Sequence, residues 1–224
     1  MNKFLKHLMS KKIFFGLYFL FFIVALVFAF TEIKGFGIFW FDNHRNKILN
    51  IFFEAVTKLG EYYIFIFFII YFLIKKSRVS FSIMALGVFI PFISYALKSF
   101  FKHPRPLTYF YKYLKHVNFK GIEDMHYHTG HNSFPSGHTF AAFALFTFLM
   151  LISKNKSWQI IYLLISVLVG LSRIYLAQHF IEDVAFGSIL GIIMAGFIYY
   201  LFFILWKNKT FLDVDILSLK GKKI

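Results

Sequence analysis

The fold class is decided by one stretch near the start of the chain, Ile13-Phe-Phe-Gly-Leu-Tyr-Phe-Leu-Phe-Phe-Ile-Val-Ala-Leu-Val-Phe-Ala-Phe30, which carries no charged residue. A helix needs roughly 20 mostly apolar residues to cross a lipid bilayer. Lys11 and Lys12 precede the stretch, as basic residues precede a signal peptide. However, the stretch exceeds the apolar segment of about 7–15 residues that such a peptide has. We therefore predict that it is retained as a first transmembrane helix.

The rest of the chain has the same apolar character. Hydrophobic residues make up 59% of its 224 residues, whereas soluble domains are nearer half. The apolar runs predict six transmembrane helices, over residues 13–31, 56–74, 79–101, 136–153, 158–177 and 184–206. The second contains the shortest uncharged run, so it reaches membrane length only with Lys58 and Glu61 at an interface. We predict an all-α integral membrane protein with a single domain over residues 1–224.

Basic residues predict how these helices are oriented. More than half of the 25 lysines and arginines lie at the N-terminus, in the loops 75–78 and 154–157, and after Trp206, together with only two acidic residues. Cytoplasmic segments of membrane proteins are enriched in lysine and arginine. We therefore expect both termini in the cytoplasm and the segments 32–60 and 102–137 on the outer side. Apolar residues at helical spacing in the first segment predict an amphipathic helix along the membrane surface.

The charge and the absence of cysteine exclude several classes of protein. Aromatic residues make up 23% of the chain, which is too many for a disordered basic tail. A chain without cysteine is not a disulfide-stabilised secreted domain, a thiol enzyme or a Cys-ligated metal protein. Most of the formal charge of +15 falls in the expected cytoplasmic segments. We therefore interpret it as a topology signal and not as a nucleic-acid-binding surface.

Three polar clusters lie where the expected helices meet the outer surface. They are Lys98-Ser-Phe-Phe-Lys-His-Pro-Arg105-Pro106, Ser133-Phe-Pro135-Ser136-Gly137-His138-Thr139 and Ser172-Arg173-Ile-Tyr-Leu-Ala-Gln-His179-Phe-Ile-Glu-Asp183. A cation inside or beside a transmembrane helix is unfavourable and marks a candidate functional site. Lys98, Arg105 and Arg173 at one depth would repel one another unless they surround an anion. A phosphate group suits them, because its oxygens match the planar fork of arginine.

The other residues of these clusters also suit phosphate chemistry. Ser136 and Gly137 lie at the start of a helix, where backbone N–H groups and the helix dipole favour an anion. His179 and Asp183 are four residues apart, which in a helix places them on one face. A carboxylate on one ring nitrogen leaves the other nitrogen as a nucleophile or base. His138 is placed to give a proton to a leaving group.

Together the clusters resemble the signature of the type-2 phosphatidic acid phosphatase (PAP2) superfamily. Its three parts, Lys-x6-Arg-Pro, Pro-Ser-Gly-His and Ser-Arg-x5-His-x3-Asp, are intact and in order across residues 98–183. The resemblance implies a helical bundle of the type shared by PAP2 phosphatases and haloperoxidases. The phosphate-binding residues that it implies are Lys98, Arg105, Ser136, Gly137 and Arg173.

The resemblance also implies the catalytic residues. His179 is expected to attack phosphorus and form a phosphohistidine, and Asp183 to orient His179. His138 is expected to protonate the leaving oxygen and then to help activate water. No metal or other cofactor is expected, because the cations take the place of a metal ion.

The resemblance also implies the substrate, which is a phosphorylated lipid at the outer face of a bacterial cytoplasmic membrane. Undecaprenyl diphosphate, phosphatidylglycerol phosphate, phosphatidic acid and lipid A phosphates all remain open, as does the oligomeric state. Membrane lipids are expected partners, and nucleic acid is not. Two alternatives also remain: a non-catalytic lipid-binding or transport protein on the same scaffold, and a vanadium haloperoxidase-like activity, which the six expected helices disfavour.

The loop residues His126, His128 and His131 leave a further question open. Three histidines so close together can bind zinc or another divalent ion, and Glu123 or Asp124 would complete such a set. A polar loop that lies over the site without a metal is the favoured interpretation. Gly187 and Gly191 have the spacing of a helix-packing motif, for which we expect close packing within the chain and not a dimer contact.

Overall fold

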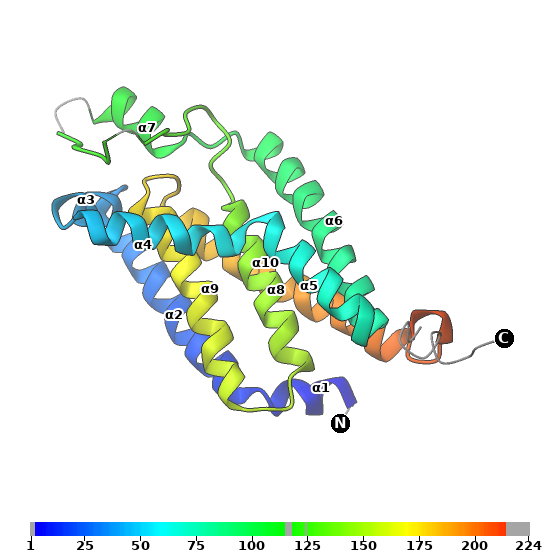
Figure 1. Cartoon of the computed structure of the whole chain (residues 1–224). Coiled ribbons are helices and arrows are strands. Elements are labelled where there is room, and N and C mark those ends of the chain that lie inside the picture. The colour runs from blue at the N-terminus through cyan, green and yellow to red at the C-terminus, as the bar shows by residue number, and fades with distance from the viewer. Residues whose placement is uncertain (1–2, 115–117, 124, 214–224) are drawn as a thin grey trace.

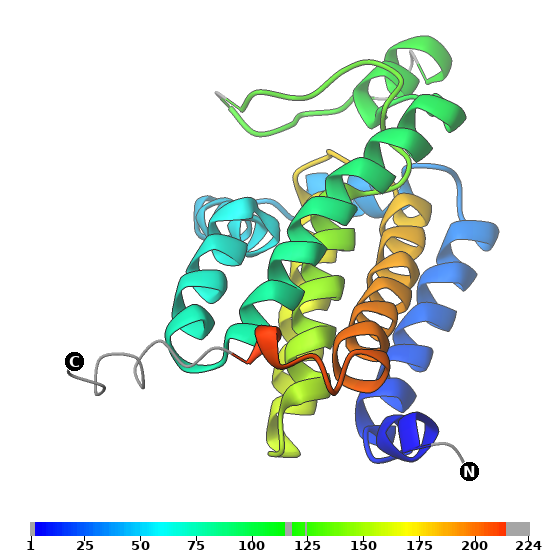
Figure 2. The same ribbon diagram turned by 90° about the vertical axis from the view of Figure 1, so that its right-hand side faces the viewer.

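The computed structural model describes residues 3–114, 118–123 and 125–213. These residues form helices and loops and contain no strand (Figures 1 and 2). The all-α prediction is therefore confirmed over this part of the chain. Asp124 and the end of the basic tail, residues 214–224, lie outside the described residues.

The helices follow one another along the chain with short connections, except before α8. Their bounds are α1 (Lys3–Met9), α2 (Lys12–Thr31), α3 (Phe36–Asn43), α4 (Lys47–Thr57), α5 (Tyr62–Lys75), α6 (Ser77–Phe101), α7 (Pro106–Tyr113), α8 (Gly137–Ile152), α9 (Ser157–Tyr175) and α10 (Ile181–Tyr199). A 3₁₀ turn (Lys58–Gly60) joins α4 to α5, and a π-helical turn extends α10 to Leu205. The short helices α1, α3 and α7 were not predicted from the sequence.

Four helices of the described chain are long and apolar enough to cross a membrane: α2, α6, α9 and α10. A fifth span results if the bent pair formed by Lys47–Gly60 and Tyr62–Ile74 is counted as one. The chain is thus a multi-pass membrane protein with four or five candidate spans. The fourth predicted span, over residues 136–153, corresponds to α8, whose 16 residues fall short of membrane length.

The predicted second helix, over residues 56–74, is not a single straight helix. The chain bends by 52° where the 3₁₀ turn meets α5, and Glu61 at the bend has an extended backbone. Residues 56 and 57 belong to α4. The apolar stripe of α4 that the sequence indicated faces away from the protein, because Ile48 and Ile51 are exposed.

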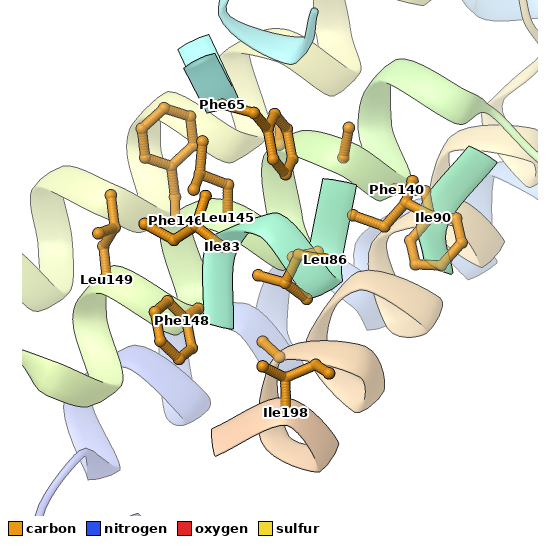
Figure 3. Close-up of a cluster of buried hydrophobic side chains, with 14 of the residues drawn as sticks. Phe65, Ile83, Leu86, Ile90, Phe140, Leu145, Phe146, Phe148, Leu149 and Ile198 are labelled. Carbon is orange, nitrogen blue, oxygen red and sulfur yellow. The ribbon is translucent and has the colours of Figure 1, made fainter. Parts of the chain in front are cut away.

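The short helix α8 forms the centre of the bundle. Every residue from Thr139 to Leu151 is buried, with α6, α9 and α10 packed around the helix. Figure 3 shows Phe140 and Phe148 of α8 pointing into one cluster with Leu86 of α6 and Ile198 of α10. A helix that neighbours enclose in this way need not match the roughly 30 Å of the hydrocarbon core by itself.

Glycine allows α10 to approach α8 closely. A Cβ on Gly191 would lie 2.6 Å from Cβ of Phe143 and 2.8 Å from the backbone of Phe140 and Ala144. A Cβ on Gly187 would lie 2.7 Å from the carbonyl of Ser136. The two glycines therefore serve packing within the chain, as expected from their spacing.

Gly191→Ala is predicted to destabilise the protein, because the added methyl group must push α10 away from the α8 backbone. Overpacking of this kind costs roughly 1–3 kcal/mol, and we expect a lower melting temperature in detergent. Gly196→Ala on the same helix is the matched control, since a Cβ there meets no atom within 4 Å. An equally stable Gly191→Ala variant would contradict the packing described for this interface.

Basic residues at the end of the bundle away from the 102–137 loop also hold helix ends together. Arg78 of α6 is buried, and it donates to Asp213 at 2.7 Å and to the carbonyls of Phe202 and Trp206 at the end of α10. Lys11 donates to the carbonyl of Ser153 after α8. Arg78 and Lys11, which the sequence predicts to lie on the cytoplasmic side, therefore also link the ends of neighbouring helices.

Candidate active site

The three sequence clusters meet at one end of the bundle. In Figure 1 the end of α6, the start of α8 and the connection from α9 to α10 all lie near the top, beneath the loop that carries α7. The helix ends follow from the sequence. Helix α6 stops before Pro104, because the helical conformation is unfavourable for a residue that precedes a proline. Helix α7 begins at Pro106, because a proline fits the first turn of a helix. The chain thus places Lys98, Arg105 and His103 around this turn.

His179 is buried within electrostatic reach of the three cations. Its side chain is 2% exposed, between α9 and α10. Burial, followed by the charges of Arg105, Arg173 and Lys98, holds the pKa of His179 well below its usual value of 6.5. All three predicted phosphate-binding cations therefore act on the predicted nucleophile.

Asp183 holds one side of the His179 ring. Its Oδ2 lies 3.4 Å from Nδ1 of His179 and accepts hydrogen bonds from the Ser133 hydroxyl at 2.6 Å and the Phe180 N–H at 3.0 Å. Because Asp183 and Ser133 face Nδ1, Nε2 is the nitrogen left for chemistry.

The two arginines are fixed by neutral oxygens and keep donors free. Arg105 donates from Nε to Asn132 at 2.9 Å and from Nη1 to the carbonyl of Gln178 at 3.1 Å. Arg173 donates from Nη1 to the Thr57 hydroxyl at 2.6 Å, while its buried Nε has no hydrogen-bond partner in the described chain. Neither guanidinium is in a salt bridge among the described residues. Their charge is thus available to an anion.

The start of α8 adds backbone donors. Ser136 is the N-cap of the helix and Gly137 its first residue, so the N–H groups of the first turn have no partner inside the helix. The Ser136 hydroxyl lies 2.8 Å from that of Thr139. Either hydroxyl can be the donor in that contact, and the backbone N–H groups of the turn are donors in addition to the Ser136 side chain.

His138 lies between the cations and an apolar groove. Arg173, His179, Lys98 and Arg105 all act electrostatically on its ring. The groove has a volume of about 420 Å³ and runs between α5, α6 and α8, where Phe65, Ile90 and Pro91 line it together with Glu61 and His138. An apolar groove that ends at the site can hold a hydrocarbon chain.

The segment before α8 lies over this end of the bundle. Asp42 of α3 accepts hydrogen bonds from the N–H groups of Lys120 at 2.8 Å and Gly121 at 2.9 Å. Partial burial, followed by the charges of Arg105 and Arg173, lowers the pKa of His128, so His128 lies near the cations.

The three loop histidines do not form a metal-binding group in this structure. The rings of His126 and His128 are 5.7 Å apart. No group of three or more His, Asp or Glu side chains among the described residues is arranged to hold a metal ion. Asp124, a further candidate ligand, is not among those residues.

Several site residues were not assigned a role from the sequence. They are Thr57 and Asn132, which contact the arginines, Ser133, which contacts Asp183, His103, whose Nδ1 lies 3.8 Å from Oδ1 of Asp183, and Glu61, whose carboxylate faces His138 at 3.7 Å. Only Ser133 and His103 lie inside the quoted clusters. Thr57 and Glu61 come from the α4–α5 connection, and nothing in their local sequence indicates the contact.

Comparison with known proteins shows which family the chain resembles. Residues 78–207, more than half of the chain, match the family model described as the PAP2 superfamily. Lipid phosphate phosphatase 2 of Arabidopsis thaliana is 34% identical over 146 residues, which cover 55% of this chain and 49% of that protein. The chain spans between 27% and 49% of the length of the curated relatives that it matches.

Two solved structures share the fold. The crystal structure of Aquifex aeolicus LpxE has a TM-score of 0.58 and 27% identity, covering 72% of this chain and 91% of that one. A transmembrane PAP2-type phosphatidylglycerolphosphate phosphatase from Bacillus subtilis has a TM-score of 0.62 and 24% identity, covering 85% of this chain and 94% of that one. The second supports the fold alone.

Proposed function

The chain belongs to the PAP2 superfamily, and we propose that it is a membrane lipid phosphatase that hydrolyses a phosphomonoester or diphosphate of a lipid through a phosphohistidine at His179. One observation carries the proposal: His179 is buried among three cations with its Nδ1 against Asp183. A buried imidazole that is kept neutral and oriented is a nucleophile. The cations around it are suited to the charge of a phosphoryl group.

The first step transfers the phosphoryl group to the enzyme. Lys98, Arg105 and Arg173 bind its oxygens together with the N–H groups at the start of α8. The Nε2 electron pair of His179 attacks phosphorus, and Asp183 stabilises the positive charge that develops on the ring. The bond from phosphorus to the lipid oxygen breaks, and that oxygen takes a proton from His138.

The second step releases phosphate. His138, now neutral, accepts a proton from a water molecule. The water oxygen bonds to phosphorus as the phosphorus–nitrogen bond breaks and returns its electron pair to His179. Phosphate then leaves, and both histidines regain their starting state. The three protein cations supply the positive charge throughout, so the mechanism needs no metal ion.

The apolar groove between α5, α6 and α8 supports a lipid substrate. It opens beside His138, which donates the proton to the leaving group. The lipid part of the leaving group therefore occupies the groove while the phosphate lies among the cations. This combination of a hydrocarbon chain and a phosphate is present in undecaprenyl diphosphate, phosphatidylglycerol phosphate, phosphatidic acid and lipid A phosphates.

The proposal includes the topology of the single domain. The bent α4–α5 pair and the enclosed helix α8 count as the second and fourth of six spans, with both termini in the cytoplasm and the site at the outer face of the cytoplasmic membrane. Figure 2 supports this, because helix α1 (blue) and the 3₁₀ turn Thr210–Leu212 (red) lie toward the end of the bundle away from the loop that covers the site. A cysteine introduced into that loop should react with a membrane-impermeant maleimide in intact cells.

Phosphate release from a panel of the four lipid classes, with and without a chelator, tests the function and identifies the substrate. We expect release from at least one class, unchanged by the chelator. If the wild-type protein releases no phosphate but moves lipid between leaflets, the non-catalytic alternative is correct. Loss of activity with the chelator and its recovery with a divalent ion would contradict the metal-free mechanism.

The depressed pKa of His179 predicts the pH dependence of the reaction. A nucleophilic histidine must be neutral, so activity falls as the pH drops through its pKa. Because this pKa is held well below 6.5, the acid limb of kcat/KM is expected below pH 6.5. A pH profile of kcat/KM on the preferred lipid measures it. An acid limb at or above the ordinary histidine value would contradict the environment assigned to His179.

A further inference from the structure

Glu61 lies against the proposed proton donor. It occupies the bend between the 3₁₀ turn and α5, and its Oε1 is 3.7 Å from Nε2 of His138. This is ion-pair distance and longer than a hydrogen bond, as is common for catalytic contacts before substrate binds. The side chains of Glu61 and His138 are only 29% and 33% exposed.

The backbone at Gly60 brings Glu61 close to His138. Gly60 precedes Glu61, and a Cβ on Gly60 would lie 2.8 Å from the carbonyl oxygen of His138 and 2.9 Å from a side-chain carbon of Val169. Only a residue without a side chain lets the turn approach α8 and α9 so closely. The turn thereby holds the carboxylate of Glu61 beside His138.

The groups around His138 make a nearby carboxylate useful for holding a proton on its ring. The groups that act on the ring are Arg173 of α9, Lys98 of α6, and Arg105 and His179 of the loops. All are cationic or become so on protonation. Repulsion from them opposes the positive charge that a proton-donating imidazole must carry, and a carboxylate in contact offsets it. Glu61 also acts on Arg173.

We propose that Glu61 is the positioning residue for His138, binding the proton on Nε2 so that the proton on Nδ1 is the one transferred. When the bond from phosphorus to the lipid oxygen breaks, that oxygen takes the Nδ1 proton, and the Nε2 proton stays with Glu61. In the second step, Nδ1 takes a proton from the attacking water. Each histidine of the site then has its own carboxylate: Asp183 for His179 and Glu61 for His138. The inference rests on the proposed phosphatase function.

Glu61→Gln tests it, because the amide keeps the shape of the side chain and removes the charge. On a lipid alkyl phosphate we expect kcat to fall about tenfold or more, with little change in KM. The alkaline limb of kcat should also move to lower pH, because a donor without its carboxylate loses its proton more readily. Glu61→Asp should recover part of both effects.

Glu54→Gln is the matched control: it makes the same change on an exposed glutamate of α4 that is not among the charges acting on His138. Melting temperatures of the variants in detergent check that they fold alike. A Glu61→Gln variant with the kcat and alkaline limb of the wild type would overturn the inference, as would a loss confined to KM. If the wild type and Glu54→Gln release no phosphate, the proposed function fails instead.

Discussion

Replacing His179 with alanine is expected to reduce phosphate release from the preferred lipid at least about 100-fold. The substitution removes the only protein atom that bonds to phosphorus in our mechanism, and the cations and groove remain in place. Lipid binding should therefore persist while turnover is lost. The measurement is phosphate release by purified protein in detergent, with lipid binding measured separately.

His131→Ala is the matched control for this experiment. It removes an exposed loop histidine, and we expect near wild-type turnover from it. If His179→Ala keeps near wild-type turnover, His179 is not the nucleophile. If His131→Ala instead loses activity that a divalent ion restores, the loop histidines bind a metal.

His138→Ala is the second variant with a large expected effect, and the effect should depend on the leaving group. On a lipid alkyl phosphate we expect a loss of at least about 100-fold, because the departing alkoxide needs a proton. An alkyl-substituted nitrophenyl phosphate releases a stable phenolate that needs none. Formation of the phosphoenzyme from that substrate should be much less affected. Single-turnover release of the phenolate by both proteins measures the difference.

Equal losses on both substrates would contradict the role of His138 as proton donor. They would instead indicate that its ring mainly positions the substrate. Phosphate release from the nitrophenyl substrate should still be slow in this variant, because the second step needs His138 to accept a proton from water.

Much of the fold follows from local sequence. Long uncharged runs such as 13–30 are sufficient to predict helices, because apolar side chains and internally paired backbone groups are what a bilayer requires. The same logic fails where a helix is shielded from lipid. Helix α8 is enclosed by its neighbours and is shorter than a span, and the 56–74 run bends at Glu61, which contacts His138 of α8. The short helix α3 is also set by tertiary contacts, through Asp42 and the covering loop.

In the candidate site, too, some contacts follow from local sequence and others depend on tertiary packing. The four-residue spacing predicted that Asp183 meets His179, and the two do meet, although His179 lies before α10 begins and not on its face. Prolines mark the helix ends that gather the cations. Thr57 and Glu61, by contrast, reach Arg173 and His138 through pairings of residues far apart in the sequence. No local pattern encodes such contacts, since they depend on how closely the turn at Gly60 packs against α8.

Trapping of the phosphoenzyme tests the central claim most directly. Wild-type protein and the His138→Ala and His179→Ala variants would be mixed with a lipid or nitrophenyl substrate labelled at phosphorus, quenched in base and digested. We expect label on the peptide that contains His179, stable to base and lost in acid. From the nitrophenyl substrate, His138→Ala should carry more label than the wild type, and His179→Ala should carry none from either substrate. Label on another residue, or unchanged labelling of His179→Ala, would contradict the account.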